Sequence, residues 1–445
     1  MDIRDPGQES SRREGWRQLL PVGLILAGVA VSGALLSPGA SSDSAAILDI
    51  ETGVSPSADE APTAEPSEAL SDPSQPPATP PHRDPLEVPD GTSSATDPSA
   101  AVALAPGEWS VLASPPVPAP LEGVTVWTGS EVITWGGVGV GTDSPRQVLR
   151  ADGAAYSPAE DAWRLIAASS LTPRRGMAGA WTGAELLVWG GADESSHLAD
   201  GAAYDPRLDQ WRPLAASPLS ARSDSAAVWT GDELLVIGGH DNGGPLNDAA
   251  AYDPRRDEWR VLSPGPAALA RVWQLSGVWA GDSAVLWPRD GAAEPGARYA
   301  VDSDTWVSFP PVGAGADVIR QVLWTGEEML GVMAGRNSGH MNVVWMGRGE
   351  QWEEADLPPG LNAWGSTALW TDFGLVILTP GPQGWLYEPG SQVWSQLPAG
   401  PQLELQDRSA ISTGSELVLW EASPDGGAQA SGAVFRFPSA AAGSG

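Results

Sequence analysis

RRGMAGAWTGAELLVWGGADESSHLADGAAYDPRLDQW (residues 174–211) is followed by a stretch of equal length, RSDSAAVWTGDELLVIGGHDNGGPLNDAAAYDPRRDEW (residues 222–259). In each, a run of small residues ends in Trp-Thr-Gly, and a short apolar run then ends in two glycines. A tyrosine follows a polar loop, and a second tryptophan comes after an Asp-Pro turn. This order predicts four short strands joined by turns. Self-similarity at this length predicts a fold made of copies of one unit.

The same spacing continues along the chain. An aromatic residue precedes a tryptophan by seven positions at Tyr156/Trp163, Tyr204/Trp211, Tyr252/Trp259, Tyr299/Trp306, Trp345/Trp352 and Tyr387/Trp394. A second series runs in step with these pairs: Trp127, Trp181, Trp229, Trp279, Trp324 and Trp370. Four antiparallel strands in every repeat are typical of propeller blades, so we expect an all-β propeller over residues 106–438.

The two ends of this region predict how the ring closes. After Trp394 comes a partial unit, in which Phe435 stands at the tyrosine position and no tryptophan follows. At the other end, Trp109 in GEWSVL has no partner strand before it. We therefore expect residues 107–112 to supply the outer strand of the last blade, giving seven blades without an open edge.

The paired glycines, the tyrosine after a variable loop and the later tryptophan resemble the kelch repeat. Blades one to three carry the pairs Gly136-Gly137, Gly190-Gly191 and Gly238-Gly239, whereas the later blades keep only the aromatic spacing. The resemblance implies a seven-bladed kelch-type β-propeller, as in the central domain of galactose oxidase. The copper–radical site of that enzyme requires a cysteine, and this chain has none. We expect no cofactor and no metal.

An apolar segment precedes the repeats. Residues 19–36 (LLPVGLILAGVAVSGALL) carry no charge and nearly reach across a bilayer as one hydrophobic helix. Arginines precede this segment, and the next basic residue is Arg83, so residues 1–18 are expected in the cytoplasm and the propeller outside. Two alternatives stay open: a transmembrane signal-anchor that holds the chain at the cell membrane, or a cleaved signal peptide that leads to secretion.

The composition predicts which segments are disordered and which kinds of partner are excluded. Residues 37–105 are rich in Ser, Pro, Ala and acidic residues, which predicts a disordered linker, and residues 439–445 read as a flexible tail. The formal net charge is −32, and every basic side chain is an arginine. Such a chain repels phosphate backbones, so nucleic acid is not an expected partner.

Candidate binding residues lie in the loops after the second and fourth strands, which emerge on one face of a blade. Arginines entering the inner strands could bind a carboxylate or an acidic peptide around the axis. Histidines occupy equivalent loops of two blades, with Asp241 beside the second, and two tryptophans lie off the period. The candidates are Arg175, Arg222, Arg271, His197, His240, Asp241, Trp273 and Trp364. The competing interpretations are arginines paired with neighbouring acids, histidines facing water and tryptophans packed in the core.

These features predict a membrane-tethered, extracytoplasmic kelch-repeat protein that binds a protein, carbohydrate or other small-molecule partner on its loop-rich face without catalysis. The alternative is a carbohydrate-active enzyme of the sugar isomerase or epimerase kind, working in the axial depression. No nucleophile motif or phosphate loop favours the enzyme. An acid–base pair close to His197, His240 or an off-period tryptophan would favour it.

Overall fold

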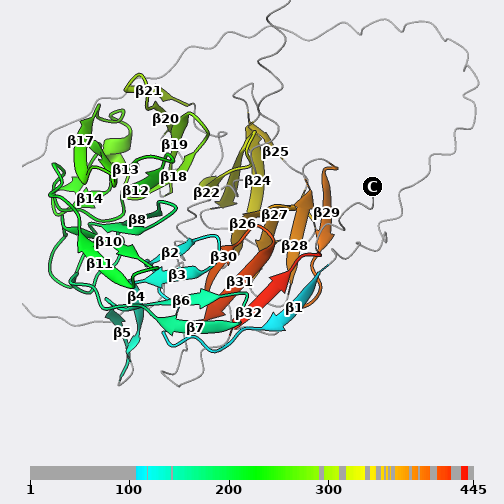
Figure 1. Ribbon diagram of the computed structural model, residues 1–445. Coiled ribbons are helices and arrows are strands. Elements are labelled where there is room, and N and C mark those ends of the chain that lie inside the picture. Colours follow the sequence, from blue (N-terminus) through cyan, green and yellow to red (C-terminus); the bar gives the residue numbers. More distant parts are fainter. Residues whose placement is uncertain are drawn as a thin grey trace, which may run out of the picture. The chain divides into compact units, whose positions relative to one another are not determined.

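The computed structural model describes the repeat region, with short gaps (Figure 1). The described residues are 107–117, 119–141, 144–289, 295–309, 317–335, 341–346, 352–354, 357–358, 361, 366–379, 383–388, 391–400, 408–421 and 432–438. Within these ranges the only helical element is the 3₁₀ turn η1 (Leu269–Arg271), and no helix there is long and apolar enough to cross a bilayer. The predicted apolar segment 19–36, the linker 37–105 and the tail 439–445 lie outside the described residues.

Six four-stranded antiparallel sheets are built from strands in chain order. The first is β2 (Val124–Trp127), β3 (Val132–Trp135), β6 (Gly153–Ser157) and β7 (Ala162–Leu165). The second is β8 (Ala178–Trp181), β9 (Leu186–Trp189), β10 (Gly201–Asp205) and β11 (Gln210–Pro213). The third is β12 (Ala226–Trp229), β13 (Leu234–Ile237), β16 (Ala249–Asp253) and β17 (Glu258–Leu262).

The fourth sheet is β18 (Leu275–Trp279), β19 (Ser283–Pro288), β20 (Ala297–Ala300) and β21 (Thr305–Ser308). The fifth is β22 (Asp317–Trp324), β23 (Met329–Gly335), β24 (Met341–Met346) and β25 (Trp352–Glu354). The sixth is β26 (Thr367–Thr371), β27 (Gly374–Leu378), β28 (Gly384–Glu388) and β29 (Val393–Gln396). Two short hairpins lie outside the sheets: β4 (Val138–Gly141) with β5 (Ser144–Leu149), and β14 (His240–Asp241) with β15 (Gly244–Pro245).

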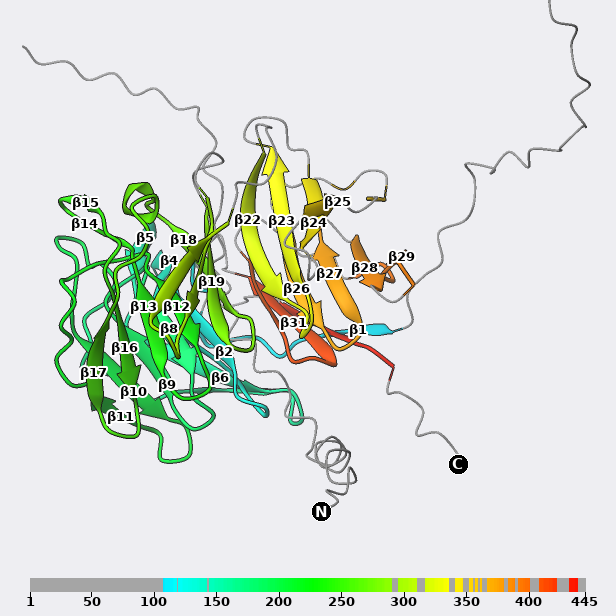
Figure 2. The same ribbon diagram turned by 90° about the horizontal axis from the view of Figure 1, so that it is seen from above.

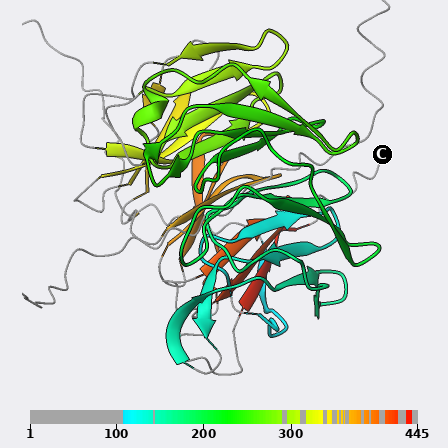
Figure 3. The same ribbon diagram turned by 90° about the vertical axis from the view of Figure 1, so that its left-hand side faces the viewer.

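A further four-stranded sheet joins both ends of the domain. It consists of β30 (Arg408–Ser412), β31 (Glu416–Glu421), β32 (Gly432–Arg436) and, as its outer strand, β1 (Glu108–Val111). Trp109 lies opposite Phe435, with ring centroids 5.1 Å apart, and its indole Nε1 donates to the Pro398 carbonyl at 2.8 Å. Figure 1 shows the cyan β1 beside the red β32, and Figure 3 shows cyan and red strands next to each other from another side. The predicted closing strand is confirmed.

The first strand of each sheet contacts its counterparts in the two neighbouring sheets. These contacts run from β2 to β8, β12, β18, β22, β26 and β30, and from β30 back to β2. Buried side chains of successive sheets form shared clusters, for example Val124 and Ile133 with Val188. Since each sheet buries its faces against its neighbours, the core lies between sheets. The all-β propeller prediction is confirmed.

The aromatic spacing has a direct structural cause. The tyrosine and tryptophan of a repeat face each other across the third and fourth strands, as Tyr204 and Trp211 do. Trp211 Nε1 donates to the Ala167 carbonyl of the preceding sheet at 2.8 Å, and Asp209 accepts from the Ala167 N–H at 2.8 Å. The Tyr204 hydroxyl donates to the same Asp209 at 2.6 Å. Trp345 departs from the pattern, because Trp352 lies opposite Met346 instead.

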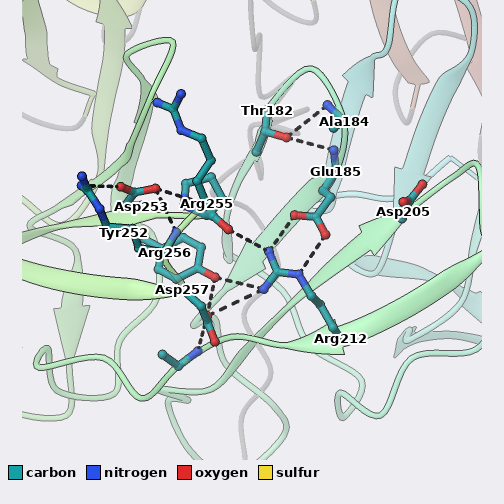
Figure 4. Close-up of polar contacts among 12 residues, drawn as sticks. Thr182, Ala184, Glu185, Asp205, Arg212, Tyr252, Asp253, Arg255, Arg256 and Asp257 are labelled. Atoms are coloured by element: carbon teal, nitrogen blue, oxygen red, sulfur yellow. Dashed lines mark hydrogen bonds and ion pairs between the residues drawn. The ribbon is translucent and has the colours of Figure 1, made fainter.

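A charged network also crosses between sheets, as Figure 4 shows for Arg212. Its guanidinium donates to both carboxylate oxygens of Glu185, at 2.8 and 2.6 Å, and to the hydroxyl of Tyr252 in the next sheet at 3.2 Å. Arg164 makes the same contacts with Glu131 and Tyr204. Burial, together with the hydrogen bond to Asp257, raises the pKa of Tyr252 to about 12. These hydroxyls therefore stay protonated donors at physiological pH.

Candidate binding site on the loop-bearing face

The loops after the second and fourth strands meet on one face, as predicted. Isolated bridges pair Leu121 with Val138, Arg175 with Ala192 and Ser223 with His240, so each bridge joins a segment entering an inner strand to the loop that follows the second strand. Figure 2 shows β14 and β15 beyond the ends of β13 and β16, at this face. We call this side the loop face.

Arg222 lies inside the third sheet's loop, with 0% of its surface exposed. Its guanidinium donates to both oxygens of Asp248, at 2.6 and 2.9 Å, and to the Gly238 carbonyl at 3.1 Å. Arg174, also 0% exposed, makes the equivalent contacts with Asp200 and Gly190. Arg222 thus holds the loop together and has no surface to offer a ligand. The equivalent of Arg222 is Arg174, which was not among the predicted residues.

The glycine pair is part of the same assembly. The N–H of Gly191 donates to the Arg222 carbonyl at 2.9 Å, which links the second sheet to the third. Gly239 has φ +83°, and a Cβ placed on it would lie 2.5 Å from the Ser223 carbonyl oxygen. A side chain at this position would disrupt both the backbone conformation and the approach of the two loops.

The three predicted arginines do not converge. Arg175 is half exposed, and its Nη1 donates to Glu122 Oε2 at 2.9 Å, across the boundary between the first and second sheets. Arg271 is exposed at the end of η1. With Arg222 buried and Arg175 paired with a carboxylate, the arrangement does not form the cationic ring expected for an acidic ligand.

A different group of predicted residues does come together. His197 and His240 lie edge to face with ring centroids 5.2 Å apart, and the ring of Trp273 lies 4.9 Å from that of His240. His240 Nδ1 is 3.4 Å from the Trp273 carbonyl oxygen and 3.7 Å from Asp224 Oδ2. Ser223 Oγ donates to Asp224 Oδ2 at 3.0 Å and lies 3.4 Å from His240 Nε2. We name Trp273, His240, His197, Ser223 and Asp224 the His240 cluster.

Asp224 was not predicted from the sequence, and its position depends on the backbone. It has φ +55°, and its N–H donates to the Gly176 carbonyl at 2.8 Å, while the Gly176 N–H donates to the Glu122 carbonyl at 3.0 Å. A Cβ on Gly176 would lie 3.1 Å from Asp224 Oδ1, so a glycine in the second sheet leaves room for this carboxylate. Burial raises the pKa of Asp224, with the Ser223 hydroxyl and His240 acting in the opposite direction.

The cluster is partly open to solvent. Trp273 is 49% exposed and is therefore not a core residue. The side chains of His240 and Asp224 are 19% and 23% exposed. His197 Nδ1 is buried and makes no hydrogen bond within the described residues. An indole surface, imidazole edges and a carboxylate are thus presented together at the loop face.

The remaining predicted residues fall elsewhere. Asp241 accepts a hydrogen bond from the Gly243 N–H at 2.7 Å and shapes the turn between β14 and β15. Trp364 lies outside the described residues. Among the described residues no three His, Asp or Glu side chains are grouped to hold a metal ion.

The repeated sheets define the class of fold: a β-propeller, with the loops after the second and fourth strands on one face. Residues 94–286 match the family model described as the KLHDC2/KLHL20/DRC7 Kelch-repeats domain. Together with the blade arrangement, this match supports a kelch-repeat propeller family, as the glycine pairs predicted. No match was found among the curated proteins.

Proposed function

We propose that this kelch propeller is a non-catalytic scaffold that binds a protein partner through the loop face. The observation that carries the proposal is the His240 cluster, in which a half-exposed tryptophan packs against His240 and His240 lies next to the Asp224 carboxylate. Large aromatic residues that are partly exposed on a rigid scaffold are typical anchors of protein interfaces. Kelch propellers as a class are suited to this role.

We also propose that the blades form one closed ring. The cycle of neighbouring first strands supports one closed ring of seven blades, in which the sheet containing β1 is the clasp. Closure would keep the loops of separate blades in fixed positions, so that they form one binding surface.

We also propose that the propeller lies outside the cell membrane. This proposal rests on the apolar run at residues 19–36, the arginines before it and the linker behind it. Protease added to intact cells should release a fragment that contains the propeller by cutting within residues 37–105. Complete protection of the propeller in intact cells, with cleavage after lysis, would place it inside.

Partner capture by the full chain tests the binding role. Trp273→Ala should reduce recovery of the partner, because it removes the exposed indole from the loop face. Leu208→Ala is the matched control, since Leu208 is 65% exposed in the turn between β10 and β11, at the opposite ends of the strands. Equal losses from both variants would contradict binding at the loop face.

A second candidate keeps one specific support. Asp224 and His240 form an acid–base pair beside an exposed tryptophan, which is the arrangement that would favour a carbohydrate-active enzyme. Incubation of the full chain with simple hexoses should give no isomer or epimer if the scaffold proposal holds. Turnover that is lost in both Asp224→Asn and His240→Ala would replace the scaffold with the enzyme.

A further inference from the structure

The charges around the His240 cluster indicate which kind of partner side chain it suits. Two arginines of the loop face are already paired with carboxylates of the protein. Arg175 is bound to Glu122 at 2.9 Å, and Arg222 is bound to Asp248 at 2.6 and 2.9 Å. Asp224 accepts a hydrogen bond from the Ser223 hydroxyl, and its ion-pair partner among the described residues is His240, at 3.7 Å and charged only when protonated. Among the described residues, no arginine forms an ion pair with the Asp224 carboxylate.

The aromatic part of the cluster, like its carboxylate, suits a cationic side chain. The rings of His240 and Trp273 pack edge to face, with the two planes inclined at 63°, and Trp273 remains 49% exposed. The face of an indole ring attracts guanidinium and ammonium groups more strongly than the ring faces of tyrosine and phenylalanine do. A planar guanidinium can both stack on an indole and pair with a carboxylate, which an ammonium does less well.

We propose that the cluster binds a basic side chain of the partner, with arginine preferred to lysine, through the Trp273 indole and the Asp224 carboxylate, which both contact His240. This inference rests on the proposed scaffold function and deepens it by naming the chemistry of the partner. The net charge of −32 attracts a basic segment over a longer range, and the cluster supplies the specific contact.

A pH dependence follows from the groups that face Asp224. These are His240 and Ser223 at its own loop, Glu122 and Arg175 from the neighbouring sheets, and Trp273 across His240. The cation binds the ionised carboxylate and not the protonated one. Because burial raises the pKa of Asp224, its carboxylate is protonated at a higher pH than an ordinary aspartate, and affinity for the basic ligand falls as the pH is lowered through that range.

The test is calorimetric titration of the full chain, at physiological salt, with tetra-arginine and with tetra-citrulline, which has nearly the same shape without the charge. The expected result is binding of tetra-arginine at least about tenfold tighter than of tetra-citrulline. Asp224→Asn should weaken tetra-arginine binding by about tenfold, because asparagine tolerates the left-handed backbone but carries no charge. Trp273→Phe should weaken it less than Trp273→Ala does.

Asp232→Asn is the matched control, because it removes one exposed carboxylate from the opposite end of the same sheet. It should leave tetra-arginine binding unchanged, and all four variants should melt within a few degrees of the wild type. Equal binding of tetra-citrulline, equal loss in Asp232→Asn, or no binding of tetra-arginine would each overturn the inference. Tighter binding of tetra-glutamate would overturn it in favour of Arg175. Partner capture that depends on Trp273 but not on Asp224 would leave the scaffold function standing and reject the basic ligand.

Discussion

Residues at equivalent positions of the repeats have the same backbone conformation and make equivalent contacts, as four aspartates show. Asp209 has φ +51°, accepts hydrogen bonds from the Tyr204 hydroxyl and the Ala167 N–H, and so ties two sheets together. Its counterparts Asp161, Asp257 and Asp304 have φ of +47°, +54° and +51°. The left-handed conformation explains why these positions hold aspartate, whose short side chain tolerates it.

Replacing Asp209 separates the two contributions. Asp209→Ala should destabilise the fold by about 1–2 kcal/mol, because it loses both hydrogen bonds and places alanine in the left-handed region. Asp209→Asn keeps an acceptor and the backbone preference, so its loss should be smaller. Urea unfolding at neutral pH measures both free energies. Equal losses would mean that the charge of Asp209, and neither its acceptor oxygen nor its backbone conformation, accounts for the stabilisation.

Acid should weaken the same contact. The Tyr204 hydroxyl and the Ala167 N–H lower the pKa of Asp209. A carboxylate with a lowered pKa in the folded state stabilises the fold above its ordinary pKa, and this stabilisation is lost as the pH falls through the folded value. Wild-type stability should therefore fall below about pH 4, and Asp209→Asn should show a shallower fall. Parallel pH profiles for the two proteins would refute this role.

Arg222 tests whether the buried arginines are structural. Arg222→Met leaves Asp248 and the Gly238 carbonyl without their donor, so it should cost about 3–5 kcal/mol of unfolding free energy. Arg271→Gln, at an exposed site, should change the unfolding free energy by less than about 0.5 kcal/mol. A stable Arg222→Met variant would show that the pair contributes little.

The strands and turns of blades one to three could be predicted from the sequence, because short strands and tight turns depend on residues close together in the chain. The Trp-Thr-Gly turn and the glycine pair predicted the ends of the first two strands in blades one to three. The site was harder to predict, because Asp224 is brought to His240 by backbone hydrogen bonds between sheets. One signal could have found the buried arginines: Arg174 and Asp200, like Arg222 and Asp248, are separated by 26 positions.

Two glycines of the third sheet allow a prediction about elements. Gly231 has φ +103° with nothing within 4 Å of a built Cβ, whereas Gly239 is crowded by Ser223 and Ser225. Gly231→Ala should cost about 1 kcal/mol, from the backbone conformation alone. Gly239→Ala should cost at least about 2 kcal/mol more, because two loops must also separate. Thermal unfolding ranks the two, and the reverse order would contradict the packing of the glycine pair.

At the scale of the whole molecule, the loop face exists only if the sheets are held around one axis. Trp109 of the outer strand β1 lies opposite Phe435, and its indole donates a hydrogen bond to the carbonyl of Pro398, just after β29. β1 thus has the role that the fourth strand has in the other sheets. Its removal would leave β32 as an unpaired edge.

Hydrogen exchange on the chain lacking residues 107–112 tests this closure most directly, with the full chain as reference. The amides of β32 should lose protection, the melting temperature should fall, and exchange should also increase in the loops around His240 as the ring loosens. Unchanged protection in β32 and an unchanged melting temperature would show that the ends of the domain do not clasp the ring, and the single binding surface built on that closure would have to be abandoned.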